Sequence, residues 1–197
     1  MPLVAIEGPD GLGKSTIASY LVSHAESFGI EAEVVVPEPS KRFGRHPDAL
    51  AWGWHLLKRY KDVPERLVIL DRFPIPSEFI YGRPQQVQTS DPQYLRVLED
   101  LSYTPLQFVY VFPSLELVKA LFPDPESRED GLAVYNTIVK DPMFQGDIYK
   151  WLAVTQLYAA WACHNNNRML RLERKLGKRW SHSTANKILD WLGYKVF

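Results

Sequence analysis

A short glycine-rich segment near the start of the chain has the residue types and the spacing of a phosphate-binding loop. The segment Gly8–Thr16 has the sequence GPDGLGKST, which fits the pattern G-x-x-x-x-G-K-[ST]. Its glycines let backbone N–H groups turn inward around phosphate oxygens, and a helix that follows adds the positive end of its dipole. The chemistry of this segment is therefore the binding of a polyphosphate.

Two side chains of the segment could act on phosphates and on a metal ion. The ammonium of Lys14 can reach the β- and γ-phosphates of a nucleoside triphosphate, and the hydroxyl of Ser15 can bind Mg²⁺. A glycine-rich turn that fits by chance is the alternative, but the segment stands between a strand pattern and a helix pattern, as the mechanism requires. The residues that the pattern assigns to the triphosphate are Gly8, Gly11, Gly13, Lys14, Ser15 and Thr16.

A second polar group follows the apolar run Leu67–Leu70. Asp71, Arg72 and Phe73 come directly after that run, and ligands of parallel α/β sheets bind at the carboxyl ends of the strands. Asp71 could hold Mg²⁺ directly or through water. Arg72 could present its planar fork to an anionic acceptor or to the phosphoryl group in transfer. A surface ion pair at the end of a strand is the alternative.

A carboxylate between two prolines follows the second apolar run. Glu38 lies between Pro37 and Pro39, directly after the expected strand Val34–Val36. At this edge of the sheet Glu38 could orient an acceptor or take its proton. A rigid strand exit with a solvated glutamate is the alternative, because proline often marks such exits.

The elements that must position these residues follow an alternating pattern. Short apolar runs alternate with helical spacing, which is typical of βαβ units and of a parallel sheet covered on both faces. The expected strands are Leu3–Ile6, Val34–Val36, Leu67–Leu70, Phe108–Phe112 and Met169–Leu172. The expected helices cover residues 17–28, 50–57, 91–101, 115–121, 147–162 and 183–192, with Ser114 as an N-cap. The sequence thus predicts a three-layer α/β fold, and the charged, Pro-rich segment Phe122–Gly131 is expected to be a mobile loop.

Composition limits the classes of protein to which the chain could belong. The chain has 197 residues, of which 46% are hydrophobic, so we expect one domain over residues 1–197. Lys plus Arg and Asp plus Glu both number 23, which gives no overall attraction to nucleic acid or to a membrane. The single cysteine, Cys163, excludes an internal disulfide. We find no signal peptide and no run of roughly 20 apolar residues, so we expect a soluble, cytoplasmic protein.

Most aromatic residues are expected to serve packing. Trp52, Trp54 and Phe73 lie near the expected crevice, where one of them could stack on a base, although core packing is the commoner role. A further set is expected to take part in helix packing: Tyr149, Trp151, Tyr158 and Trp161.

Three segments resemble the thymidylate kinase family. Residues Glu7–Thr16 are similar to the E-G-x-D-G-x-G-K-S-T loop of that family. Residues Asp71–Phe73, followed by Ser77 and Tyr81, resemble its D-R-Y/F…S…Y segment, and Val111–Glu116 resembles the strand and helix start that precede its lid. The order of the elements matches over essentially the whole chain.

This resemblance implies a P-loop NTPase fold with five parallel strands and a lid, here approximately residues 122–131. It also implies transfer of a phosphoryl group from ATP to dTMP, or to a related pyrimidine nucleotide, with Mg²⁺. By the same resemblance, Asp10 should lie near the sugar hydroxyl, Asp71 near the metal and Arg72 on the acceptor phosphate. Arg128 would be the lid arginine that contacts the nucleotide.

Two departures from the family keep other acceptors open. Pro37 stands where the family usually has an arginine for the acceptor phosphate, and the lid segment offers only Arg128. Residues Val35–Pro39 also resemble deoxynucleoside kinases, in which the glutamate is the base for a 5′-hydroxyl.

A third acceptor is 5-hydroxymethyluracil already in phage DNA, as in thymidylate-kinase-like phage enzymes. Under that alternative a group of basic residues could touch the DNA backbone, namely Arg168, Arg171, Arg174, Lys175, Lys178 and Arg179. The non-enzyme alternative is a nucleotide-binding switch module. A homodimer is left open by the sequence.

Overall fold

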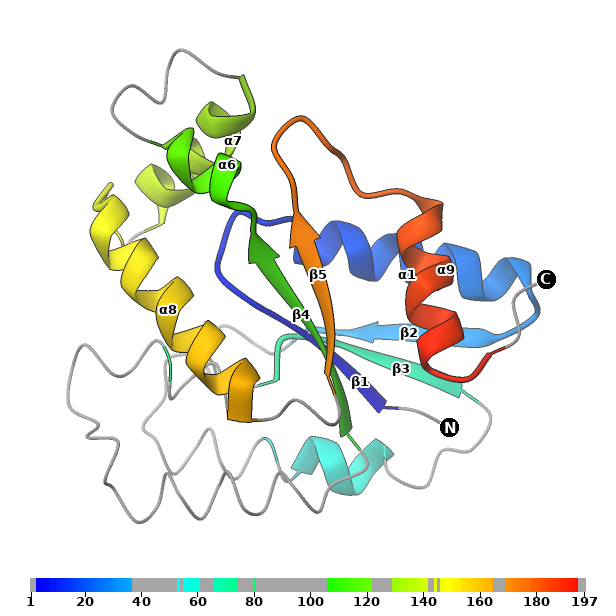
Figure 1. The fold of residues 1–197 in the computed structure, drawn as a ribbon. Helices are drawn as coiled ribbons and strands as arrows, with labels where there is room; N and C mark the ends of the chain where they lie inside the picture. Colours follow the sequence, from blue (N-terminus) through cyan, green and yellow to red (C-terminus); the bar gives the residue numbers. More distant parts are fainter. Residues whose placement is uncertain are drawn as a thin grey trace.

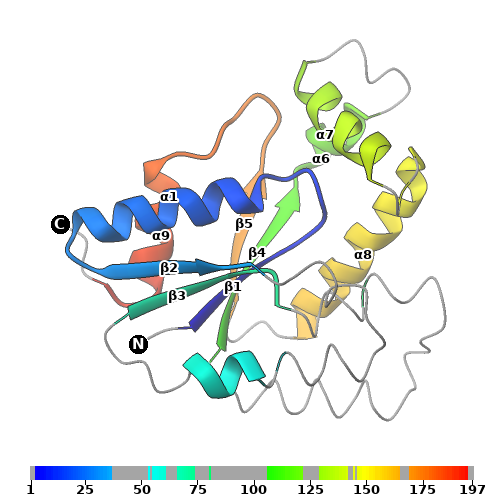
Figure 2. The ribbon, with the colours of Figure 1, turned by 180° about the vertical axis from the view of Figure 1, so that it is seen from behind.

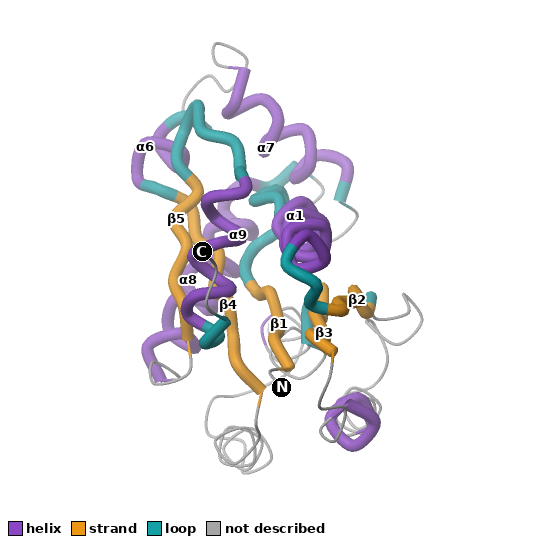
Figure 3. Tube along the Cα trace, turned by 90° about the vertical axis from the view of Figure 1, so that its right-hand side faces the viewer, coloured by secondary structure: helices purple, strands orange, loops and turns teal. Residues whose placement is uncertain are grey.

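Five parallel strands form one sheet at the centre of the molecule. The structure, a computed structural model, describes residues 3–36, 53, 55–60, 66–73, 80, 106–121, 129–141, 144, 146–164 and 169–194. The strands are β1 (Leu3–Glu7), β2 (Glu31–Val35), β3 (Arg66–Asp71), β4 (Leu106–Pro113) and β5 (Met169–Arg174). They lie in the order β2-β3-β1-β4-β5, and every neighbouring pair is parallel, as Figure 3 shows from the side.

Helices cover both faces of the sheet. They are α1 (Lys14–Ser27), α6 (Leu115–Lys119), α7 (Glu129–Lys140), α8 (Ile148–His164) and α9 (His182–Trp191). Helices α1 and α9 lie together on one side, while α8 lies on the other (Figures 1 and 2). The predicted three-layer α/β fold with a five-stranded parallel sheet is confirmed. Among the described helices, none has the length and apolar character needed to cross a membrane.

Strand β1 is the central strand, and its position explains where the site forms. All five of its residues are buried, and it pairs with β3 on one side and β4 on the other. From β1 the chain first builds β2 and β3 on one side and then β4 and β5 on the other. The register pairs Ile6 with Asp71, which places the end of β3 beside the start of the glycine-rich loop. A crevice at such a reversal of strand order is the usual ligand site in this architecture.

The glycine-rich loop (residues 8–16) leaves β1 in a narrow space. Gly8 has a φ of 139°, and a Cβ atom at this position would clash with the backbone carbonyl oxygen of Val111 in β4. Only glycine combines that backbone conformation with so close an approach. The loop then continues directly into α1, which begins at Lys14.

The second strand differs from its predicted bounds. The sequence predicted Val34–Val36, whereas β2 runs from Glu31 to Val35 and is only partly buried. It is an edge strand, and the side chain of Arg66 on β3 pairs with both Glu31 and Glu33. Charged residues are therefore stabilised inside this strand, where a search for continuous apolar runs does not expect them.

One helix was not predicted, and it overlaps the end of the expected loop. Helix α7 begins at Glu129, so the interpretation of Phe122–Gly131 as a loop is wrong for its last three residues. Val134 and Ile138 of α7 are buried four residues apart, a helical spacing that was readable in the sequence. Residues 122–128 and the predicted helix over 91–101 lie outside the described residues.

Candidate functional site

Residues from two segments line one cavity at the carboxyl end of the sheet. The cavity has a volume of about 270 Å³. Its lining residues are Asp10, Gly11, Gly13, Lys14, Ser15, Thr16, Asp71 and Arg72. The first six belong to the glycine-rich loop and the start of α1, and the last two to the end of β3. The two segments that the sequence analysis singled out therefore meet around a common space.

Lys14 is a buried ammonium with several charged neighbours. Its side chain is only 6% exposed, its Nζ donates to the carbonyl oxygen of Pro9 at 2.7 Å, and the same atom lies 3.7 Å from Asp10 Oδ1. Burial, followed by the positive charge of Arg72, lowers the pKa of Lys14 to about 8. An anion beside Lys14 would favour its charged form and raise that pKa.

Ser15 and Asp71 bring two side-chain oxygen atoms together in the cavity. The hydroxyl of Ser15 donates to Asp71 Oδ2 at 2.6 Å, so α1 and β3 are joined at this point. Hydroxyl and carboxylate oxygens are ligands of the kind that Mg²⁺ takes, with water and phosphate oxygens completing its octahedron. The two residues thus fit the metal that the sequence implied. Within the described part of the chain, no group of three or more His, Cys, Asp or Glu side chains could hold a metal ion.

Arg72 is held in an uncommon backbone conformation beside the cavity. Its φ is 77°, in the left-handed region, which costs of order 1–3 kcal/mol for a residue other than glycine. Its N–H donates to the carbonyl oxygen of Ile6 at 3.2 Å. Its guanidinium forms an ion pair with Asp10 and donates from Nη1 to the hydroxyl of Tyr158 at 3.3 Å. These contacts fix the direction of the guanidinium.

Glu7 lies beneath Arg72 and connects it to β3 and α8. One carboxylate oxygen accepts a hydrogen bond from the N–H of Phe73, and the other accepts from the hydroxyl of Tyr158 at 3.0 Å. Complete burial raises the pKa of Glu7, and the nearby charge of Arg72 acts in the opposite direction. Glu7 therefore links the end of β3 to α8 through two hydrogen bonds beside the cations of the site.

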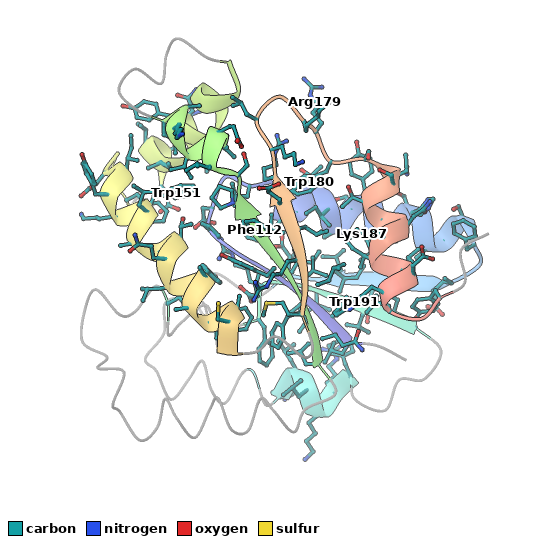
Figure 4. All side chains as sticks on the ribbon, viewed as in Figure 1. Phe112, Trp151, Arg179, Trp180, Lys187 and Trp191 are labelled. Atoms are coloured by element: carbon teal, nitrogen blue, oxygen red, sulfur yellow. The ribbon has the colours of Figure 1, made fainter. Side chains whose placement is uncertain are left out.

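Three aromatic side chains contact the site, although the sequence analysis gave none of them a functional role. Tyr158 bonds to both Glu7 and Arg72. The indole Nε1 of Trp151 donates to the carbonyl oxygen of Asp10 at 2.9 Å, and that of Trp180 donates to the carbonyl oxygen of Leu12 at 2.8 Å. Figure 4 labels Trp151 on α8 and Trp180 beside the end of β5. The available signal was the presence of two buried aromatic residues with polar tips, seven positions apart on α8, because such tips need partners.

The other residues named in the sequence analysis lie in the core, near the cavity, at the surface or outside the described residues. Phe73 is fully buried in the core, so it cannot stack on a base, and its packing role is confirmed. Gly8 approaches β4 and is not among the residues that line the cavity. Tyr149 is 74% exposed, so the prediction that it packs between helices is wrong. Outside the described residues lie Pro37, Glu38, Pro39, Trp52, Trp54 and Arg128.

The basic group lies along β5 and the segment that follows it. Arg171 donates to the carbonyl oxygen of Ala162 at 3.3 Å, and the guanidinium carbon of Arg174 lies 5.7 Å from the ring centre of Trp180. Lys175 pairs with Glu173 at 3.8 Å. Arg179 and Lys178 are exposed, and Arg168 lies outside the described residues. Several members of this group thus have partners within the chain.

Comparisons with known proteins show the fold. No family model matches the chain, and no curated protein matches it at significant sequence similarity. The YorR protein from Bacillus subtilis, solved in complex with phosphorylated GDP, is similar with a TM-score of 0.57 and 19% identity, over 97% of this chain and 95% of that chain. A deoxyadenosine kinase from M.mycoides, with the products dCMP and a flexible dCDP bound, has a TM-score of 0.49 and 14% identity, over 96% and 97% of the two chains. The first of these likenesses shows that the α/β fold described above is shared with YorR along almost the full length of both chains.

Proposed function

We propose that this protein is a nucleotide kinase that transfers the γ-phosphoryl group of ATP to a deoxynucleoside monophosphate, dTMP or a related pyrimidine nucleotide. The observation that carries the proposal is the shared cavity, which is lined by the glycine-rich loop with Lys14 and also by Asp71 and Arg72. Phosphoryl transfer needs little covalent chemistry from a protein. It needs two substrates held in line and the charge of the transferring group neutralised.

The main polar groups of the cavity would each have a role in this reaction. The N–H groups of the loop and the ammonium of Lys14 would bind the β- and γ-phosphates. Ser15 and Asp71 would hold Mg²⁺, which neutralises phosphate charge when it is bound. The guanidinium of Arg72 would face the acceptor phosphate or the phosphoryl group in transfer, where its planar fork can donate two parallel hydrogen bonds. Arg128, in the proposed lid, would add a further cation to the nucleotide.

A second candidate acceptor is a neutral hydroxyl, and one observation favours it. The guanidinium of Arg72 forms an ion pair with Asp10, so part of its charge already has a partner. An acceptor phosphate would share Arg72 with that carboxylate, whereas a hydroxyl on a deoxynucleoside, or on 5-hydroxymethyluracil in DNA, would not compete with Asp10. Such an acceptor needs a base, and Glu38 is the candidate for that role.

An acceptor screen tests the proposal. Purified protein with Mg²⁺ and ATP would be incubated with each deoxynucleoside monophosphate, each deoxynucleoside and DNA that carries hydroxymethylated pyrimidine. GTP would be tried as a second donor, because YorR was solved with a guanine nucleotide bound. We expect ADP to form fastest with a pyrimidine monophosphate and not to form with folded Lys14→Ala protein.

Three other outcomes are informative. Fast turnover with a deoxynucleoside or with modified DNA would replace the monophosphate proposal by the second candidate. ATP consumption that no acceptor accelerates would favour a nucleotide-dependent switch module. Near-wild-type turnover in folded Lys14→Ala protein would overturn the kinase proposal itself.

A further inference from the structure

Two tryptophans hold the glycine-rich loop from outside the cavity. The indole N–H of Trp151, on α8, donates to the carbonyl oxygen of Asp10, and the indole N–H of Trp180, after β5, donates to the carbonyl oxygen of Leu12. The bond from Trp151 to Asp10 measures 2.9 Å and joins residues 141 positions apart in the sequence. The bond from Trp180 to Leu12 measures 2.8 Å and joins residues 168 positions apart. Figure 4 labels the two side chains, which come from different elements. Distant parts of the chain thus converge on alternate carbonyls of one short loop.

The planarity of the peptide bond gives these contacts a consequence inside the cavity. The carbonyl of Asp10 belongs to the same peptide plane as the N–H of Gly11, and the carbonyl of Leu12 to the same plane as the N–H of Gly13. In a trans peptide the C=O and N–H bonds point in opposite directions. An indole that holds the carbonyl on one side therefore aims the N–H toward the other side.

The cavity lies beside the two glycines that carry those N–H groups. Gly11 and Gly13 are among the residues that line it, whereas neither tryptophan is. The packing at Gly13 is also tight, since a Cβ atom there would lie 2.9 Å from Trp180 Nε1. The indole of Trp180 therefore rests directly against the outer side of the loop.

From this geometry we propose that Trp151 and Trp180 are positioning residues that fix the N–H groups of Gly11 and Gly13 toward the phosphates of the donor. The proposal rests on the proposed function, because it assumes that the cavity binds a polyphosphate. A loop whose N–H groups are already aimed binds an anion without first losing backbone freedom. A hydrogen bond to the carbonyl also polarises the peptide, so that its N–H becomes a better donor.

The specific requirement is for an indole N–H rather than for an aromatic ring. Phenylalanine keeps most of the packing of tryptophan but cannot donate a hydrogen bond. Trp151→Phe and Trp180→Phe would therefore free one carbonyl each while leaving apolar bulk in place. Trp191→Phe makes the same chemical change on α9, where the side chain is partly buried, and serves as the matched control.

Binding of inorganic tripolyphosphate with Mg²⁺, measured by calorimetry, tests the proposal. This probe has no base or sugar, so any change must act through phosphate recognition. We expect each of the two variants to bind tripolyphosphate and ATP roughly fivefold more weakly than the wild type, since each loses one hydrogen bond of ordinary strength. The double variant should bind both ligands more weakly still, and Trp191→Phe should bind them as tightly as the wild type. The KM for the acceptor should not change in any of these variants.

The possible results separate this inference from the proposed function. If the wild type binds neither ATP nor tripolyphosphate, the proposed function fails and this inference fails with it. If the wild type binds both and the folded variants bind equally well, only the inference fails. A rise in acceptor KM as large as the loss of tripolyphosphate affinity would point to general loosening and would also overturn it.

A measurement on the unchanged protein covers the case in which a variant does not fold. In ¹⁵N-labelled wild-type protein, tripolyphosphate should move the amide proton signals of Gly11 and Gly13 downfield, because those protons would bond to phosphate oxygens. The indole protons of Trp151 and Trp180 should also exchange with solvent more slowly than that of Trp191. Amide signals that stay in place when tripolyphosphate is bound would overturn the proposal.

Discussion

The charge on Lys14 should control donor binding in a pH range that is easy to reach. Burial lowers the pKa of Lys14 to about 8, so the free protein loses this charge as the pH rises through that value. We expect kcat/KM for ATP to fall on the alkaline side with an apparent pKa near 8. The fall in kcat should come at higher pH, because bound phosphates favour the charged lysine. Lys14→Arg should remove this alkaline limb, since a guanidinium keeps its charge.

The stability of the protein should change in the opposite direction over the same range. The pKa of Lys14 is lower in the folded state than its ordinary value of 10.5. Between these two pKa values the unfolded chain binds more protons, so the contribution of Lys14 to stability rises with pH. Denaturant titrations at several pH values can therefore show that a loss of ATP binding is not a loss of fold. A flat pH profile of kcat/KM would contradict the assignment of Lys14.

Two substitutions distinguish the acceptor classes at Arg72 and Glu38. A hydroxyl must lose a proton as it attacks, and a placed carboxylate supplies roughly 10²–10⁴-fold by taking it. A monophosphate needs no base but needs a counter-charge. With a monophosphate acceptor, we expect Glu38→Gln to lower kcat/KM only modestly and Arg72→Ala to lower it far more. A collapse in Glu38→Gln alone would establish a hydroxyl acceptor instead.

Local patterns predicted most of the residues that line the cavity. The loop glycines, Lys14 and Ser15 are fixed by one short motif, and Asp71 and Arg72 by their place after an apolar run. Trp180 and Glu7 were not predicted, because their roles depend on contacts between distant segments. No spacing rule relates Trp180 to a loop carbonyl 168 positions away.

Helix α8 contributes to the site through side chains on one of its faces. Trp151 bonds to the loop and Tyr158 bonds to Arg72. The two residues are seven apart, which is about two helical turns. A single helix therefore contacts both the glycine-rich loop and Arg72.

Removing the hydroxyl of Tyr158 should affect the acceptor more than the donor. Tyr158→Phe would deprive both Glu7 and Arg72 of a buried partner, at a cost of about 1–3 kcal/mol in stability. The direction of the Arg72 guanidinium would be less fixed, so we expect kcat/KM for the acceptor to fall about tenfold, as is typical when one charge-assisted contact is weakened. The dissociation constant for ATP should change little.

A neighbouring tyrosine provides the control. Tyr110 on β4 is buried and stacks on Tyr158 with ring centres 6.3 Å apart. Tyr110→Phe makes the same change beside the same helix and should leave acceptor kinetics near the wild type. Equal losses in both variants would mean that α8 packing, and not the bond to Arg72, is responsible.

The elements that were predicted well are those with strong internal patterns. Strands β1, β3 and β4 are central and buried, so their sequences are continuous apolar runs. Strand β2 lies at the edge of the sheet, so its first residues are charged and only its end is an apolar run. Helix α7 has a readable helical spacing, but it begins inside a charged segment that was interpreted as a loop.

The packing of α9 on α1 should stabilise the whole molecule without taking part in the chemistry. Ile188 on α9 is completely buried, and Ile188→Ala should cost about 2–5 kcal/mol of unfolding free energy. Well below the melting temperature, KM for ATP should remain near the wild-type value. Thermal unfolding followed by circular dichroism, with kinetics at low temperature, checks both statements.

The adjacent residue serves as the comparison for that experiment. Lys187 is exposed on the same helix, and Lys187→Ala should change stability by no more than about 0.5 kcal/mol. A large loss of ATP affinity in Ile188→Ala at low temperature would contradict a purely structural role for α9.

The sheet order also has a consequence for how the protein is made. Strand β1 and the glycine-rich loop are made well before β4 and both tryptophans that hold the loop. At about 5–20 residues per second the interval is on the order of ten seconds. During that time β1, whose residues are all buried in the finished protein, lacks β4 as a neighbour and needs shielding. A chain released before α8 and the segment after β5 are made would carry the glycine-rich loop without the two indole bonds that hold its carbonyls.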